Sequence, residues 1–224
     1  MSVSETSREL YGVRVLATAS VRMWRAWRII LPVVIVNAAV QASLLIPGVF
    51  PYLSLPFVVL SLLSFVFLAT AFGVVAVAML HATRGAVVAQ SVWSQLRERW
   101  FALLVWSLIL VVVTTLGFAL YVVPGLFIIA VTPYVLLAVV DGRGKPLWVN
   151  FRTIGVRWGR WLITIIVLAV MCLIVWVLAL LNAFFIGDAG GAFIAWIALG
   201  LVASWFVCAW ALIYRSVNPA QGGI

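Results

Sequence analysis

Six long apolar runs constrain this chain more than any other feature of its sequence. None of them contains an Asp, Glu, Lys or Arg, and they are Ile29–Ile46, Phe57–Leu80, Phe101–Val123, Gly125–Val140, Trp161–Ile186 and Ala192–Tyr214. A helix needs about 20 apolar residues to cross the hydrocarbon core of a bilayer. We therefore predict an all-α, polytopic membrane protein with six transmembrane helices.

The composition excludes the common soluble classes of protein. Of the 224 residues, 67% are apolar and 8% are charged, whereas soluble domains have about 45–50% and about 25%. So few polar residues cannot cover the surface of a cytosolic enzyme, and the chain is too apolar to be disordered. The two cysteines, Cys172 and Cys208, lie in separate apolar runs without the spacing of a disulfide framework or a metal site.

The positive charges predict the orientation in the membrane. All fourteen Lys and Arg residues lie before the first run, between the second and third, between the fourth and fifth, or after the sixth. The connections 47–56, 124–125 and 187–191 contain none. Cytoplasmic loops of membrane proteins are enriched in Lys and Arg. We therefore expect a multi-pass membrane protein with both termini in the cytoplasm. Thirteen of the fourteen cations are Arg, which together with abundant Ala, Val and Gly is typical of a GC-rich bacterial genome, so the expected location is a bacterial plasma membrane.

An amphipathic helix is predicted before the first run, within residues 8–28. At about 100° per residue, four arginines share one side of this helix: Arg14, Arg22, Arg25 and Arg28. The other side carries Val13, Leu16, Met23, Trp24 and Trp27. This pattern is typical of a helix in the headgroup layer, so the arginines are candidate contacts to anionic lipids. Alternatively, they only set the topology.

The runs divide the chain into three parts. We expect a cytoplasmic tail with the interfacial helix at 1–28, a six-span membrane domain at 29–214 and a second cytoplasmic tail at 215–224. Pro124 and Gly125 are good turn formers and predict a tight hairpin between the third and fourth spans, with a kinked helix as the alternative. Pro133 lies near the middle of the short fourth run, which is therefore either a kinked span or a re-entrant segment.

Three short motifs resemble a known membrane family. They are Val123-Pro124-Gly125-Leu126, Pro133 and Asp141-Gly142-Arg143-Gly144, and a basic amphipathic segment follows them. The pattern resembles the six-helix membrane domain that precedes some glycerophosphodiester phosphodiesterases, and also the small stand-alone bacterial relatives of that domain. The resemblance implies a six-helix fold in a membrane. It implies no catalytic residue, because the phosphodiesterase active site belongs to a separate soluble domain.

The titratable residues do not predict catalysis. No two carboxylates share an apolar run, and the single histidine, His81, has no Cys, His or Asp near it in sequence. No phosphate-binding loop or hydrolase motif occurs. We therefore expect no enzyme activity, no catalytic residue, no metal and no cofactor. Nucleic acid is not an expected partner, because the arginines alternate with membrane-seeking Trp residues.

Two sets of residues inside the runs predict contacts within the membrane. Asn37 and Gln41 lie four residues apart on one helix face, where amides either tie helices together, the favoured interpretation, or line a small polar pocket. Small residues at four-residue spacing predict close packing against this chain's own helices or against a partner helix. These are Gly200, Ser204 and Cys208 in the sixth run and Ala69 and Gly73 in the second.

We therefore expect a non-catalytic accessory or scaffold subunit of a bacterial envelope or lipid-transport assembly. Its partners would be membrane lipids and other membrane proteins. The alternative is a small transporter or lipid-passage protein that uses a polar pocket near Asn37 and Gln41.

Overall fold

The computed structural model describes residues 13–44, 54–85, 87–185 and 188–219. All regular elements in these residues are helices: α2 (Val13–Arg25), α3 (Trp27–Ser43), α4 (Leu55–Ala82), α5 (Ala89–Leu120), α6 (Val122–Val131), α7 (Val135–Val140), α8 (Pro146–Val156), α9 (Trp158–Phe185) and α10 (Asp188–Val217). Five segments are long and apolar enough to cross a membrane, and the bent pair α2–α3 is a sixth if its two helices count as one span. The all-α, polytopic fold is confirmed.

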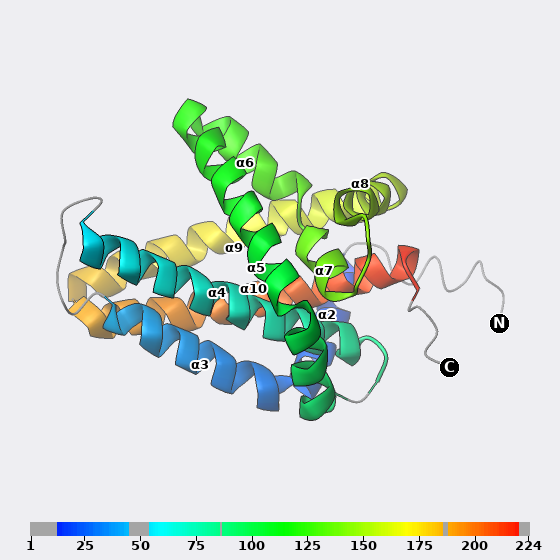
Figure 1. Ribbon diagram of the computed structural model, residues 1–224, viewed down its shortest axis with the longest axis horizontal. Helices are drawn as coiled ribbons and strands as arrows, with labels where there is room; N and C mark the ends of the chain where they lie inside the picture. The colour runs from blue at the N-terminus through cyan, green and yellow to red at the C-terminus, as the bar shows by residue number, and fades with distance from the viewer. Residues whose placement is uncertain (1–12, 45–53, 86, 186–187, 220–224) are drawn as a thin grey trace.

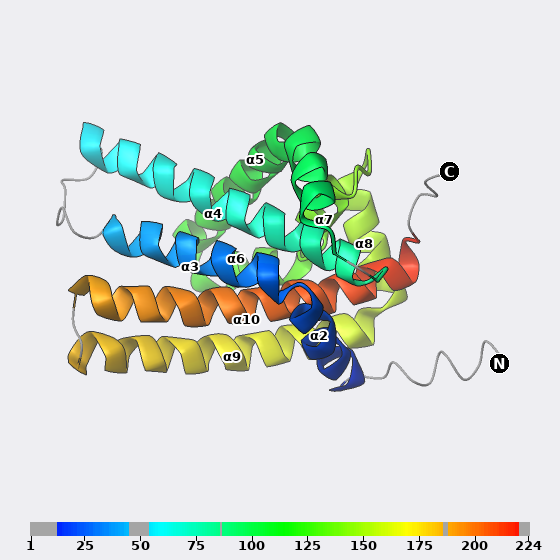
Figure 2. The same cartoon turned by 90° about the horizontal axis from the view of Figure 1, so that it is seen from below.

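Four helices form a bundle in which α10 is central. Helices α3, α4, α9 and α10 run side by side, and α10 contacts the other three (Figures 1 and 2). The fully buried side chains concentrate in the last turns of α4, between Val74 and Ala82, and of α10, between Phe206 and Tyr214. The core therefore lies at the end of the bundle where α2, α7 and α8 gather, which we call the core end (Figure 2).

The short helix α2 crosses the core end and packs on α10 (Figure 2). It is bent by 86° from α3, and Ala26 lies at the break. Val15, Leu16 and Ala19 are buried against the bundle, whereas Trp24 is 72% exposed and stacks with Trp27. An amphipathic helix is present, but it ends at Arg25, and Trp27 and Arg28, which were predicted to belong to it, lie in α3 beyond the break. The part of the predicted range before Val13 lies outside the described residues.

Helices α5 and α6 form a hairpin that leaves the bundle (Figure 1). The break is at Tyr121, whose backbone is extended, with φ −170° and ψ 158°. The prediction that Pro124 and Gly125 make the turn is wrong: both lie at the start of α6, where a proline removes no helical hydrogen bond. Gly125 instead allows close packing, since a Cβ on Gly117 would lie 3.0 Å from the Gly125 Cα.

The fourth span is a broken helix. Helix α6 ends at Val131 and α7 begins at Val135, on either side of Pro133. Residues Val123–Val140 together meet the length and hydropathy of one span, and the break does not bend them by more than 40°. This geometry favours the kinked span over the re-entrant segment.

Candidate functional site

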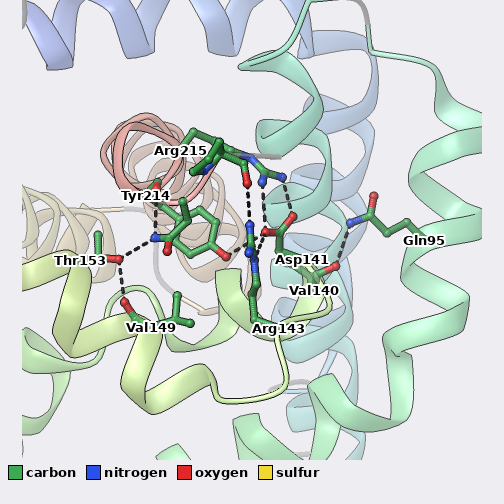
Figure 3. Close-up of polar contacts among 10 residues, drawn as sticks. Gln95, Val140, Asp141, Arg143, Val149, Thr153, Tyr214 and Arg215 are labelled. Atoms are coloured by element: carbon green, nitrogen blue, oxygen red, sulfur yellow. Dashed lines mark hydrogen bonds and ion pairs between the residues drawn. The ribbon is translucent and has the colours of Figure 1, made fainter. Parts of the chain in front are cut away.

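A buried carboxylate joins the helix ends at the core end of the bundle. The Asp141 side chain, directly after α7, is 7% exposed. Arg215 of α10 donates from Nη2 to Oδ1 at 2.6 Å and from Nη1 to Oδ2 at 3.1 Å (Figure 3). Arg143 Nε and the Tyr214 hydroxyl also donate to Oδ2, at 3.1 and 2.9 Å. Burial acts to lower the pKa of Arg143, but the hydrogen bond and charge of Asp141, together with Tyr214, raise this pKa above its ordinary value.

Two further arginines border this network. Burial and the positive charge of Arg215 lower the pKa of Arg84, which follows α4, while the charge of Asp141 opposes them. Arg99 of α5 lies over Gly142, where a Cβ would be 2.9 Å from the Arg99 Nη2. Within the described residues, neither Arg84 nor Arg99 forms an ion pair. The network therefore carries an excess of positive charge.

A chain of side-chain hydrogen bonds links α4, α5 and α7. His81 Nε2 lies 2.8 Å from Gln95 Oε1. Gln95 Nε2 donates to the Val140 carbonyl at 2.8 Å (Figure 3). Because the Gln95 amide oxygen must then accept, the His81 Nε2 carries the proton. Among the described residues no three His, Cys, Asp or Glu side chains gather into a metal site. These contacts fix the positions of helices and contain no nucleophile paired with a base.

Asn150 of α8 binds the backbone at the break in the fourth span. Its Oδ1 accepts from the Tyr134 N–H at 3.0 Å, and its Nδ2 donates to the Val131 carbonyl at 2.7 Å. Trp161 Nε1 donates to the Ala130 carbonyl at 2.8 Å. In transporters, the backbone groups freed by such a break bind the substrate. Here side chains of the same protein bind three of these groups, the Tyr134 N–H and the Val131 and Ala130 carbonyls.

The predicted headgroup arginines divide into two sets. Arg14, Arg25 and Arg28 are exposed. Arg22 is partly buried and donates from Nη1 to the Ala82 carbonyl, the last residue of α4, at 3.1 Å. A cation is favourable at the C-terminal end of a helix. Arg22 therefore binds the C-terminal end of α4. Arg28 lies over the Trp27 ring at 5.9 Å, and contact of the three exposed arginines with lipid headgroups stays a prediction.

Both stripes of small residues face helices of this chain. A Cβ on Gly200 would lie 2.8 Å from Val34 Cγ1 of α3. In the same stripe Ser204 and Cys208 are buried. A Cβ on Gly73 of α4 would lie 2.8 Å from Leu96 Cδ1 of α5, and Ala69, one turn earlier, is buried. Cys208 and the exposed Cys172 are both free thiols.

The two amides of α3 differ in their contacts. Gln41 Nε2 donates to the Ser64 carbonyl at 3.3 Å, and the Ser64 hydroxyl donates to Gln41 Oε1 at 2.7 Å, which ties α3 to α4. Asn37 is 8% exposed, and its Oδ1 has no hydrogen-bond partner. It lines two cavities, with volumes of about 80 and about 300 Å³. Of the predicted pair, Gln41 therefore links two helices by hydrogen bonds, whereas Asn37 lines cavities.

No family model, curated protein or solved structure matches this chain. The resemblance to the six-helix membrane domain of glycerophosphodiester phosphodiesterases therefore stays a prediction.

Sequence reasoning did not anticipate the network around Asp141 or the contacts of Asn150. One indication was present in the sequence. Asp141 ends an apolar run among basic residues, and Arg215 ends the last run. Two opposite charges at span ends on the same side of the membrane are candidates for a pair. Asn150 has no such indication, because a single Asn in a polar connection is an ordinary surface residue.

Proposed function

We propose that this protein is a non-catalytic subunit of a bacterial membrane assembly, and that its α5–α6 hairpin contacts the other component. The departure of this hairpin from the bundle supports the proposal (Figure 1). Helix α6 packs mainly on α5. Its outer surface is apolar, with Leu126 and Phe127 exposed. A cavity of about 420 Å³ lies between hairpin and bundle, lined in part by Phe72, Thr115 and Trp210.

The close packing inside the hairpin supports a role in contact with a partner. Because Gly117 and Gly125 have no side chains, the backbones of α5 and α6 can come into direct contact at these residues. A hairpin held in this way keeps its shape while it projects, so a partner helix meets a preorganised surface. In this proposal the network around Asp141 holds the helix ends in position and has no catalytic role.

The proposal includes an orientation, with the core end in the cytoplasm of a bacterium. Three groups of arginines support it: those of α2, those that follow α4, and those in and around α8. Positive residues in short loops favour the cytoplasmic side. In this orientation the exposed Trp24 of α2 meets the inner headgroup layer, as in an interfacial helix.

The proposal is tested by isolating the full chain from its native host in nanodiscs and measuring the mass of the complex. We expect a protein partner at fixed stoichiometry. Replacing Leu116 and Phe127 of the hairpin with Ala should release it. The matched control replaces Leu173 and Trp176 of α9, which are similarly exposed, and should retain the partner. A chain that isolates alone, or equal loss in both variants, overturns the proposal.

A further inference from the structure

An unpaired amide lies near the middle of α3. Asn37 lies well inside the helix, which runs from Trp27 to Ser43. The residue is 8% exposed, and its Oδ1 is buried with no hydrogen-bond partner. A buried polar atom without a partner costs stability, and such atoms in native proteins call for a specific explanation.

Two cavities meet at this amide. The smaller, of about 80 Å³, lies toward Gly200 and Ser204 of α10, and the larger, of about 300 Å³, lies toward Phe67 and Trp93. Asn37 lines both of them. Asn37 is therefore the residue that the two cavity walls share through an amide side chain.

The two hydroxyl groups of the cavity walls already have partners. The Ser204 hydroxyl donates to the Gly200 carbonyl at 2.7 Å. Thr70 Oγ1 donates to the Val66 carbonyl at 2.7 Å and accepts from Trp100 Nε1 at 3.1 Å. The remaining lining is hydrocarbon or aromatic. The walls therefore offer one unsatisfied acceptor in an apolar environment.

We propose that these cavities bind a neutral lipid with a free hydroxyl group, which donates its hydrogen bond to Asn37 Oδ1. A hydroxyl both satisfies the acceptor and can accept from the Asn37 amide N–H. The lining residues of the two cavities include no Lys, Arg or His, so a phosphate or carboxylate there would lose its hydration without gaining a counter-charge. Diacylglycerols and long-chain alcohols have the required chemistry.

This inference goes beyond the proposed subunit role and does not rest on it. The cavities lie between α3, α4 and α10 or beside the start of α5, whereas the proposed partner surface is the outer face of the α5–α6 hairpin. Loss of a partner protein and loss of lipid binding are therefore separate results.

The test uses the full chain in phosphatidylcholine nanodiscs and a diacylglycerol with a photoactivatable acyl chain. We expect labelling of α3 and α4 that excess dioleoylglycerol competes away. The 3-acetyl ester of dioleoylglycerol lacks the hydroxyl, and dioleoylphosphatidic acid carries a charge, so neither should compete. Equal competition by the acetyl ester, or labelling that dioleoylglycerol does not reduce, overturns the proposal and leaves a cavity filled by water or bulk lipid.

Two substitutions on the same helix separate binding from folding. Asn37→Leu removes the acceptor and the unpaired polar atom, so labelling should fall by about tenfold or more while the melting temperature rises. Gln41→Leu breaks the tie to Ser64, so the melting temperature should fall while labelling stays within about twofold. If Asn37→Leu melts below the unsubstituted protein, or labels as well as it does, the amide is structural and the proposal is wrong.

Discussion

Arg215 and Asp141 form a bidentate ion pair between the last helix and the end of the fourth span. The two nitrogen–oxygen distances are 2.6 and 3.1 Å, and the residues are 74 positions apart in the chain. Arg143 binds the same carboxylate and also donates to the Pro219 carbonyl at 2.6 Å. One carboxylate therefore fixes α7, the loop after it and the end of α10 together (Figure 3).

Removing the charge of Asp141 should destabilise the protein. In Asp141→Asn, two arginines with side chains 11% and 19% exposed lose their counter-charge. Breaking a buried pair in this way costs about 3 kcal/mol. Thermal unfolding in nanodiscs measures the loss, with Glu98→Gln as the control, because Glu98 is exposed and forms no ion pair with the described residues. Equal melting temperatures for the two variants would contradict a stabilising role for this pair.

The spans and the interfacial helix could be predicted because their causes are local. An apolar run long enough to cross the bilayer is visible in consecutive residues, and so is the alternation of basic and apolar residues in α2. The turn at Tyr121 was missed because Pro124 suits both a turn and the start of a helix.

The contacts of the candidate site depend on which helices become neighbours. Asn37 and Gln41 have similar side chains on one face of one helix, yet only Gln41 meets a hydroxyl, that of Ser64. Nothing within α3 distinguishes the two residues. In the same way, the sequence contains Asp141 and Arg215 at span ends but does not state that these two ends meet.

Gly142 should be intolerant of substitution. Its φ is +78°, in the left-handed region that disfavours side chains, and a Cβ would lie 2.9 Å from Arg99 Nη2. We expect Gly142→Ala to cost about 1–2 kcal/mol in unfolding free energy. Gly144→Ala is the matched control: a Cβ there has no neighbour within 4 Å, so its effect should stay within about 0.5 kcal/mol. Equal losses from both substitutions would refute the conformational argument.

Asn150 should be required for the broken fourth span. Asn150→Leu keeps the side-chain volume similar but leaves the Tyr134 N–H and the Val131 carbonyl without partners. Each unsatisfied buried group costs about 1–3 kcal/mol, so we expect a large fall in melting temperature and faster hydrogen exchange in α7. Phe151→Leu changes the next residue of α8, which is exposed, and should alter neither. Slow exchange in α7 of Asn150→Leu would show that other groups hold the break.

Gly200 and Val34 should show energetic coupling. A Cβ on Gly200 would lie 2.8 Å from Val34 Cγ1 and 3.3 Å from its Cγ2, so Gly200→Ala forces α10 away from α3. The higher helix propensity of Ala opposes this effect by about 1 kcal/mol, and overpacking costs about 1–3 kcal/mol. We expect a net loss of stability, with Gly155→Ala of α8, where a Cβ has no neighbour within 4 Å, as the neutral or stabilising control.

A second substitution separates the steric clash from other causes of that loss. Val34→Ala removes both methyl groups that crowd position 200, so the double variant should be more stable than the sum of the two single changes predicts, by about 0.5 kcal/mol or more. The double-mutant cycle is measured by thermal unfolding of the four proteins in nanodiscs. Additive effects would mean that α10 and α3 do not meet at these residues in the membrane, and the packing of the small-residue stripe against α3 would then be wrong.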